Sequence, residues 1–340
     1  MARFYSIVVT PAPTTAQPNP KPIKTWSSFP NGVNDPGALN VQLDLFVMLY
    51  GEPDSSNAST ITIEGVSLKD MQQAPNYAGM QITVSGGMQA GLPLANPKQA
   101  GIILQGEIMQ SFANWAGTEM TLDFVVSASS YTVSNPGNIV LDWPAGTPLS
   151  QVLPITLNTA FPSLQQKINI GTEYVLSHPV LAYYPTLHKL AKAIRSLTNS
   201  IKPPGVRIGI NPDNTIFASD GSVTPAVKTL AFTDLIGQPT WYDVNKMTFT
   251  TIMRADIQLE ELVLMPPELQ NIPGIVATAA ASGGGAQLKY QSAFKGKFVI
   301  QQIRQIGNFR DANGAAWATV FRAAPLTYGV LAGLPGAFGA

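Results

Sequence analysis

Two pairs of acidic residues are the first candidates for chemistry in this chain. Glu107 and Asp123 flank the turn of "GEIMQSFANWAGTEMTLDFVV" (residues 106–126), and such a pair could serve as the acid and base of a glycoside hydrolase. Cross-strand polar pairs are also common in ordinary sheets, which is the simpler interpretation. Glu260 and Glu261 are neighbours in a predicted strand, so their side chains point to opposite faces and cannot form one acid–base pair. One is expected to meet solvent and the other a subunit contact.

Residues that suit metals or phosphates are sparse. The chain has no cysteine, which excludes disulfides and thiolate sites, and its two histidines, His178 and His188, share no ligand motif. "PDNT" and "DANG" lack the acidic twelfth position of a calcium loop and predict turns, and "ASGGGAQLK" lacks the spacing of a phosphate loop. The sequence therefore predicts no catalytic residue, no metal site and no cofactor.

Charge is low and balanced. The 20 basic and 20 acidic residues give a formal net charge of zero, so no long-range field favours nucleic acid. Charged residues make up 12% of the chain, against about 25% in an average soluble protein, while the 45% hydrophobic content is ordinary. This combination predicts that much of the exterior meets other protein. Two short basic stripes are expected to be solvated faces or partner contacts: Lys189, Lys192 and Arg195, and Arg304, Arg310 and Arg322.

The elements that must position these residues are mostly strands. The chain has 29 glycines and 28 prolines, which separate short alternating runs such as "MQITVSGG", the pattern of a β-rich protein. Residues 1–128 are predicted to form one antiparallel β domain. The same pattern returns over residues 223–325 and predicts a second.

A small α/β module is predicted between them, over residues 129–222. Its clearest element is a helix over residues 184–200 with an apolar stripe on one side. A second helix begins at Thr147 and Pro148, and Pro154 should leave it short or kinked. "VRIGINPDNTIFAS" predicts a hairpin that turns at residues 211–214.

A repeat links the two β domains. Residues 106–126 and 301–321 both place Ile, one residue, Gln, then Asn and an aromatic residue, before a turn and a strand. Upstream, residues 70–88 and 234–253 both run from Asp through a Pro-aromatic turn into a Met-led strand. The order predicts a duplicated β unit, with Asn114 capping its turn and Trp115 filling the end of a barrel. Three such chains would present six similar units around an axis.

Two segments lack the β pattern. Residues 274–289 are small, glycine-rich and uncharged before Lys289, which predicts a mobile loop. The tail over residues 326–340 is apolar and is expected to become ordered on assembly.

Over residues 60–325 the chain resembles the baseplate hub proteins of contractile-tailed bacteriophages. The resemblance is carried by "ITIEGVSLKDMQQAPNYAGMQITVSGGM", by the ribbon that follows it, by the α/β insert and by "FVIQQIRQIGNFRDANGAAWATVF". It implies a mainly β (α+β) fold with two tail-tube-like antiparallel β-barrels around a small α/β module. It also implies a homotrimer that binds the tail-tube protein ring, the central spike protein and other baseplate proteins. Genomic DNA would pass through the lumen without specific binding, which suits the neutral charge.

Other functions remain as alternatives. A tail-associated peptidoglycan hydrolase would need an acid–base pair or a metal. A carbohydrate- or receptor-binding β module would group exposed aromatics on one face, whereas the five tryptophans are spread along the chain. The short apolar run at the N-terminus does not fit a signal peptide, and no membrane anchor is expected. The protein is therefore expected to be made in the host bacterial cytoplasm and to reside in the virion tail.

Overall fold

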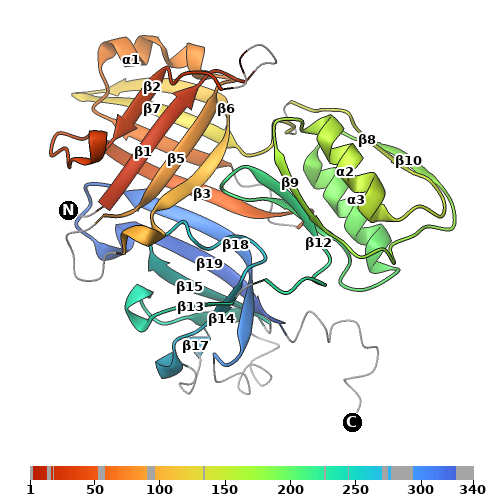
Figure 1. Ribbon diagram of the computed structural model, residues 1–340. Helices are drawn as coiled ribbons and strands as arrows, with labels where there is room; N and C mark the ends of the chain where they lie inside the picture. The colour runs from red at the N-terminus through yellow and green to blue at the C-terminus, as the bar shows by residue number, and fades with distance from the viewer. Residues whose placement is uncertain are drawn as a thin grey trace.

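The computed structural model describes residues 3–13, 17, 19–52, 58–89, 96–132, 135–225, 227–243, 245–269, 275–276 and 294–326 of the chain. Nearly all of segment 274–289 and of the tail 326–340 lies outside these residues, so the expectations for both stay predictions. Strands of the first part of the chain lie above strands of the last part, and an α/β unit lies to one side of them (Figure 1).

The described residues of the first part of the chain form seven strands. They are β1 (Arg3–Thr10), β2 (Lys24–Ser27), β3 (Asn40–Tyr50), β4 (Ser59–Glu64), β5 (Gln81–Met88), β6 (Gly101–Ala116) and β7 (Glu119–Ser127), with the short helix α1 (Leu68–Gln72) before β5. Their antiparallel order is β2-β1-β5-β6-β7-β4-β3. Alternate residues of each strand are apolar and buried, as Val41, Leu43 and Leu45 are in β3, so one face of the sheet carries the core.

The last part of the chain builds a similar sheet. Its strands are β13 (Val227–Thr229), β14 (Thr240–Asp243), β15 (Lys246–Ile252), β16 (Leu262–Leu264), β17 (Ile275–Val276), β18 (Lys297–Asn308) and β19 (Trp317–Pro325). They lie in the order β13-β16-β18-β19-β15-β14-β17. The series β5-β6-β7-β4-β3 of the first sheet thus corresponds to β16-β18-β19-β15-β14.

Irregularities in the hairpins confirm this correspondence. The β6–β7 register shifts between Ile108 and Gln110, and the β18–β19 register shifts between Ile300 and Gln302. Each first strand therefore has one bulged residue at the same place in its unit. The neighbouring registers match too, because β5 lies opposite the residues just before Ile108, and β16 opposite those just before Ile300.

The two hairpins therefore share one topology, but the predicted register of the repeat is wrong, because the sequence match sets Ile108 against Ile303 whereas the bulges set it against Ile300. The proposed match between the two Met-led strands is also wrong. β5 pairs with the first strand of its hairpin, β6, whereas β15 pairs with the second strand of its hairpin, β19. The structural counterpart of β15 is β4, which pairs with β7. Short alternating strands look alike in sequence, and only long-range pairing fixes their place in a sheet.

The two sheets are joined rather than closed into separate barrels. Residues 42–48 of β3 pair antiparallel with residues 302–308 of β18, and we call this junction the seam. One continuous sheet results, and in the described part of the chain neither half closes on itself as a separate barrel. The predicted mainly β class is confirmed, whereas two closed barrels are not found, because the edge of β3 that faces away from β4 pairs with β18.

The α/β unit packs around a core of its own. It comprises β8 (Ile139–Trp143), α2 (Leu149–Ala160), β9 (Gln165–Asn169), β10 (Val180–Tyr184), α3 (Leu187–Asn199), β11 (Arg207–Ile210) and β12 (Thr215–Ser219). The two helices lie side by side next to the β8–β10 pair (Figure 1), and Leu187, Leu190 and Ile194 of α3 are buried in this core. Two backbone pairs, Tyr50 opposite Ile208 and Leu49 opposite Gly209, tie β3 to β11.

Local predictions for this unit hold with one exception. The helix within residues 184–200 and the β11–β12 hairpin are confirmed, and Asn214 adopts a φ of 64° in the hairpin turn. Helix α2 runs for 12 residues through Pro154, so of the two predicted alternatives, a short or a kinked helix, the short helix is wrong. Within the described residues, none of the helices has both the length and the apolar character needed to cross a bilayer.

Candidate assembly interface

The β6–β7 hairpin ends in a tight turn that exposes aromatic side chains. Gly117 adopts a φ of 63° in this turn, and the Trp115 indole N–H donates to its carbonyl oxygen at 2.9 Å. Trp115 is 65% exposed and Phe112 is 51% exposed. The prediction that Trp115 fills a barrel end is therefore wrong, because the sheet does not close around it.

One side of this hairpin also has an open backbone edge. β5 pairs with β6 as far as Glu107, and backbone hydrogen bonds of 2.8 Å from Gly79 and to Met80 extend the contact to Ile108. Over residues 110–116, which we call the β6 edge, no described strand pairs with the side of β6 that faces away from β7. Unpaired N–H and C=O groups of such an edge are ready to accept another strand.

The equivalent edge of the second sheet is covered at the seam. Arg304 of β18 makes two hydrogen bonds to the Asp44 carboxylate, at 2.7 and 2.9 Å, and its guanidinium lies 4.9 Å from the Phe46 ring centre. The hydrogen bond to Asp44 raises the pKa of Arg304. The seam thus combines backbone pairing with a bidentate ion pair and a cation–π contact.

Further contacts hold the two halves together beside the seam. The Arg3 guanidinium donates to the carbonyl oxygens of Asn308 at 2.8 Å and Phe309 at 3.2 Å. Burial lowers the pKa of Arg3. From the other half, the buried Trp317 indole donates to the Gly87 carbonyl at 2.9 Å. Each contact joins residues of the first sheet to residues of the second.

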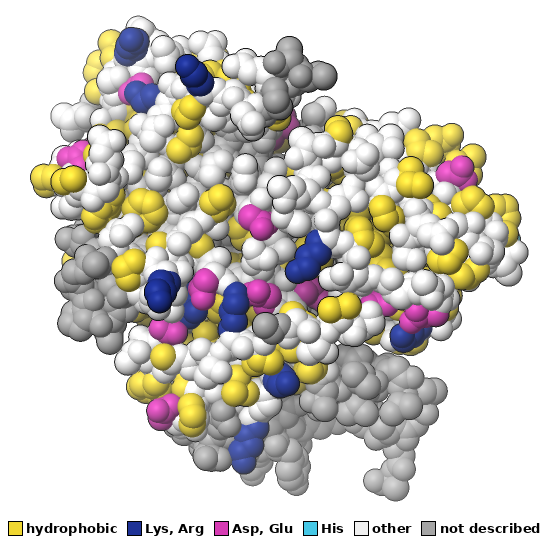
Figure 2. Space-filling view, viewed as in Figure 1, with side chains coloured by type: hydrophobic (Ala, Val, Ile, Leu, Met, Phe, Trp, Pro, Cys, Tyr) yellow, Lys and Arg dark blue, Asp and Glu magenta, His cyan; other side chains and the backbone are white. Residues whose placement is uncertain are grey.

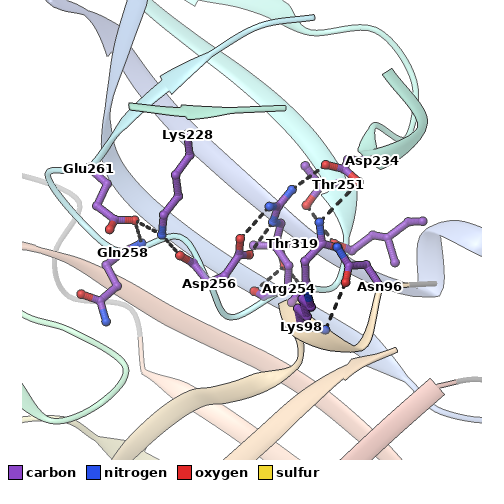
Figure 3. A network of polar contacts seen from close by, with 12 residues as sticks. Asn96, Lys98, Lys228, Asp234, Thr251, Arg254, Asp256, Gln258, Glu261 and Thr319 are labelled. Atoms are coloured by element: carbon purple, nitrogen blue, oxygen red, sulfur yellow. Dashed lines mark hydrogen bonds and ion pairs between the residues drawn. The ribbon is translucent and has the colours of Figure 1, made fainter. Parts of the chain in front are cut away.

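A polar network centred on the buried Arg254 links the loop after β15 to Asp234 and to β18 and β19 (Figure 3). Arg254 is 4% exposed and makes hydrogen bonds of 2.7 and 2.8 Å to Asp256 and one of 3.0 Å to Asp234. Its backbone N–H donates to Thr319 at 2.9 Å, and its carbonyl accepts from Gln305 at 3.0 Å. Burial by itself lowers the pKa of Arg254, but Asp256 and Asp234 outweigh it and raise the pKa. The charge is fully paired, as a structural network requires.

The predicted basic stripes are largely occupied by contacts within the chain. Arg195 pairs with Glu52, Arg310 donates to backbone carbonyls near the seam, and Arg322 lies over the Tyr242 ring. Charged side chains of both signs gather in a band across the middle of one face (Figure 2), rather than in a patch of one sign. This distribution suits protein contacts better than binding to phosphates.

The structure does not bring the candidate hydrolase pair together. Glu107 lies opposite Ser127, whereas Asp123 lies opposite Phe112, so four residues of β7, about 13 Å at ~3.3 Å per residue, separate the two positions along the ribbon. The Asp123 carboxylate accepts hydrogen bonds from Thr62 and Thr121, as a sheet side chain commonly does. This separation exceeds that of an inverting glycosidase pair, about 6.5–9.5 Å.

Glu260 and Glu261 lie in the turn before β16 and not on a strand, which corrects the prediction. Glu260 has a φ of 64°, and its carboxylate lies 2.6 Å from the Arg207 guanidinium. Burial raises the pKa of Glu260 and outweighs the opposing effect of Arg207. Glu261 pairs instead with Lys228 at 2.7 Å, so the two carboxyls have separate structural partners.

The two histidines lie in different surroundings. His178 is exposed beside Ser177. His188 lines a cavity of about 1020 Å³ between the first sheet and the α/β unit, and its Nδ1 accepts from the Gly51 N–H at 3.3 Å. Burial, helped by Lys189, lowers the pKa of His188 and favours the neutral ring.

"PDNT" and "DANG" are turns, as predicted. In the first, Thr215 donates its backbone N–H to the Asp213 side chain; in the second, Asn313 caps a single turn of 3-10 helix. No group of acidic or histidine residues that could hold a metal occurs among the described residues. The open β6 edge was not predicted from the sequence. Phe112 and Trp115, two aromatic residues close together in an alternating ribbon, could have indicated it.

The comparisons with known proteins concern the fold. No protein-family model and no curated protein sequence matches the chain. The chain is similar to a solved tail protein from Neisseria meningitidis MC58, with 12% identity, a TM-score of 0.51, and coverage of 98% of this chain and 100% of that one.

It is also similar to the 43 kDa tail protein of prophage MuSo2 from Shewanella oneidensis, with 9% identity and a TM-score of 0.53. The match covers 95% of this chain and 97% of that chain. The chain therefore shares the β-rich fold of these tail proteins over nearly its whole length.

Proposed function

We propose that this protein is a structural tail protein, namely the trimeric baseplate hub that joins the hexameric tail-tube ring to the central spike of a contractile tail. The observation that carries the proposal is the repeat of one strand order and one bulge position in the two sheets. The similarity in fold to two tail proteins supports it.

The repeat explains how three chains can meet a sixfold ring. Each chain offers two sheets with the same strand order, so three copies place six similar units around one axis. A closed ring uses one type of contact repeatedly, and here one such contact is built into the chain as the seam. Joining the units covalently fixes half of the contacts before assembly begins.

The role is geometric rather than catalytic. The structure separates the candidate carboxylates, and its charged networks pair within the chain. With a net charge of zero, the walls of a central channel would hold passing genomic DNA weakly. The other partners in this proposal are neighbouring baseplate proteins, and the site of action is the virion tail.

Sedimentation equilibrium of the purified protein, alone and with the tail-tube protein of the same phage, tests the proposal. The expected species has about three times the 36.2 kDa chain mass and co-sediments with tube rings. The hub assignment would be overturned if the protein stays monomeric at every concentration and does not bind the tube protein.

Incubation with purified peptidoglycan tests the hydrolase alternative. No release of muropeptides is expected. If release occurs, Glu107→Gln and Asp123→Asn variants will show whether these carboxylates carry it, and dependence on either one would replace the structural role with an enzymatic one.

A further inference from the structure

The strand series β5-β6-β7-β4-β3 and β16-β18-β19-β15-β14 are equivalent, but among the described residues a strand covers the hairpin edge in the second series and not in the first. Matching the bulges aligns Gln110 with Gln302, so the β6 edge over residues 110–116 corresponds to residues 302–308 of β18. The latter residues pair with β3 within the chain. The β6 edge has no such strand among the described residues, and two of its aromatic side chains are exposed.

The equivalence also identifies the strand that fits the open edge. β3 lies next to β4 in the first sheet, and its counterpart β14 lies next to β15 in the second. Within one chain, β14 is on the far side of the second sheet from the seam. We propose that the β6 edge pairs antiparallel with β14 of a second copy of this chain, which repeats the seam between subunits.

The seam sets the register of this contact. Asp44 and Thr240 are equivalent, because they lie opposite Thr60 of β4 and Thr248 of β15 respectively. Since Asp44 pairs with Ile306 at the seam, Thr240 of the second copy is placed opposite Asn114.

Two residues further along both strands, Phe112 comes near Tyr242 of the second copy, which lies at the bulge of β14 and has Arg322 over its ring. The same position at the seam holds the Arg304–Phe46 contact, at 4.9 Å. An aromatic pair therefore takes the place of a cation–π pair, and Phe112, 51% exposed in the single chain, becomes covered.

One short strand occupies the partner edge in the single chain. β17 is a two-residue strand that pairs in parallel with Thr240 and Trp241. The longer antiparallel pairing would replace it, in the way that an edge strand is exchanged when a better partner arrives.

Cysteine cross-linking tests the register directly, because the natural chain has no cysteine. The double variant Asn114→Cys with Thr240→Cys is expected to form disulfide-linked dimers and trimers on mild oxidation. The matched control is Gln105→Cys with Thr240→Cys, since Gln105 lies on the same strand but is already paired with Thr83 of β5. The control is expected to stay uncross-linked.

A second variant reports on affinity. Phe112→Glu places a charge on a position that is exposed in the single chain. The unfolding midpoint of the dissociated monomer should therefore stay the same, while the dissociation constant of the oligomer rises at least tenfold. This inference rests on the proposed function only for the number of copies. Trimers that sediment normally without the expected cross-link, or that tolerate Phe112→Glu, would overturn the edge contact and leave the hub standing. A strict monomer would overturn both.

Discussion

Arg254 shows how a buried charge in this protein is stabilised by carboxylates of the same chain. Its guanidinium is buried and bound by two carboxylates, so removal of the cation would leave Asp234 and Asp256 without their partner. We expect Arg254→Met to lower the free energy of unfolding by about 3–5 kcal/mol in urea titrations.

Arg304→Met is the matched control, because it removes an ion pair that is roughly 40% exposed on both sides, at 43% for Arg304 and 39% for Asp44. Its expected cost is about 0–1 kcal/mol. Equal losses in the two variants would contradict the view that burial, and not ion pairing as such, decides the cost.

Asp70 makes stability depend on acid pH. Burial alone would raise its pKa, but hydrogen bonds from Lys24 at 2.5 Å and Ser67 at 2.9 Å outweigh burial and lower the pKa below 3.8. A group with a lowered folded-state pKa stabilises the fold above its unfolded pKa, and this stabilisation is lost as pH falls through the folded value.

We therefore expect Asp70→Asn to cost about 1–3 kcal/mol at pH 7 and progressively less below about pH 4, as measured by urea unfolding across pH. Asp142→Asn, on the exposed side of β8, is the control and should cost about 0.5 kcal/mol or less. A deficit for Asp70→Asn that stays constant down to pH 2 would show that the lost interaction is not electrostatic.

At the scale of elements, local sequence predicted individual helices and turns, but it did not predict which strands pair. The apolar stripe of α3 and the turn residues of β11–β12 depend on neighbours within a few positions, so they could be predicted. The place of β15 could not, because its partner β19 lies some 70 residues away and any alternating strand would satisfy the same local pattern.

Helix α2 contains a proline in its interior, where proline normally destabilises a helix. Pro154 lies in the interior of the helix, where it cannot donate to the carbonyl of Ser150. We expect Pro154→Ala to raise the free energy of unfolding by about 1–3 kcal/mol, measured by urea denaturation. Pro148→Ala, just before the first helical residue, should change it by less than about 1 kcal/mol. A loss of stability in Pro154→Ala would indicate that the proline ring packs better than the helix hydrogen bond it displaces.

At the scale of the whole molecule, the seam decides how the halves behave. The sequence predicted two similar units but placed them in separate closed barrels, since nothing local shows that β3 pairs with a strand some 260 residues later. The candidate site was likewise predictable only in part. Exposed aromatics at Phe112 and Trp115 are visible in sequence, but their exposure follows from which edges the chain covers.

The seam should make the two sheets one cooperative unit. Backbone pairing over residues 302–308, with contacts from Arg3 and Trp317, means that opening one sheet exposes the edge of the other. Native-state hydrogen exchange is therefore expected to give β7 and β19 amides the same free energy of opening.

A substitution at the seam should separate them. A Cβ at Gly307 would approach Trp317 to 2.8 Å and Leu43 to 3.0 Å, so Gly307→Ala should cost about 1–3 kcal/mol and lower the protection of β19 more than that of β7. Gly314→Ala is the control, because a Cβ there meets nothing within 4 Å and should leave both strands alike. Different opening free energies in the natural chain would mean that the halves fold independently. The chain would then be two tethered units whose relative placement is fixed only on assembly, and the seam could no longer serve as the template for the contact between subunits.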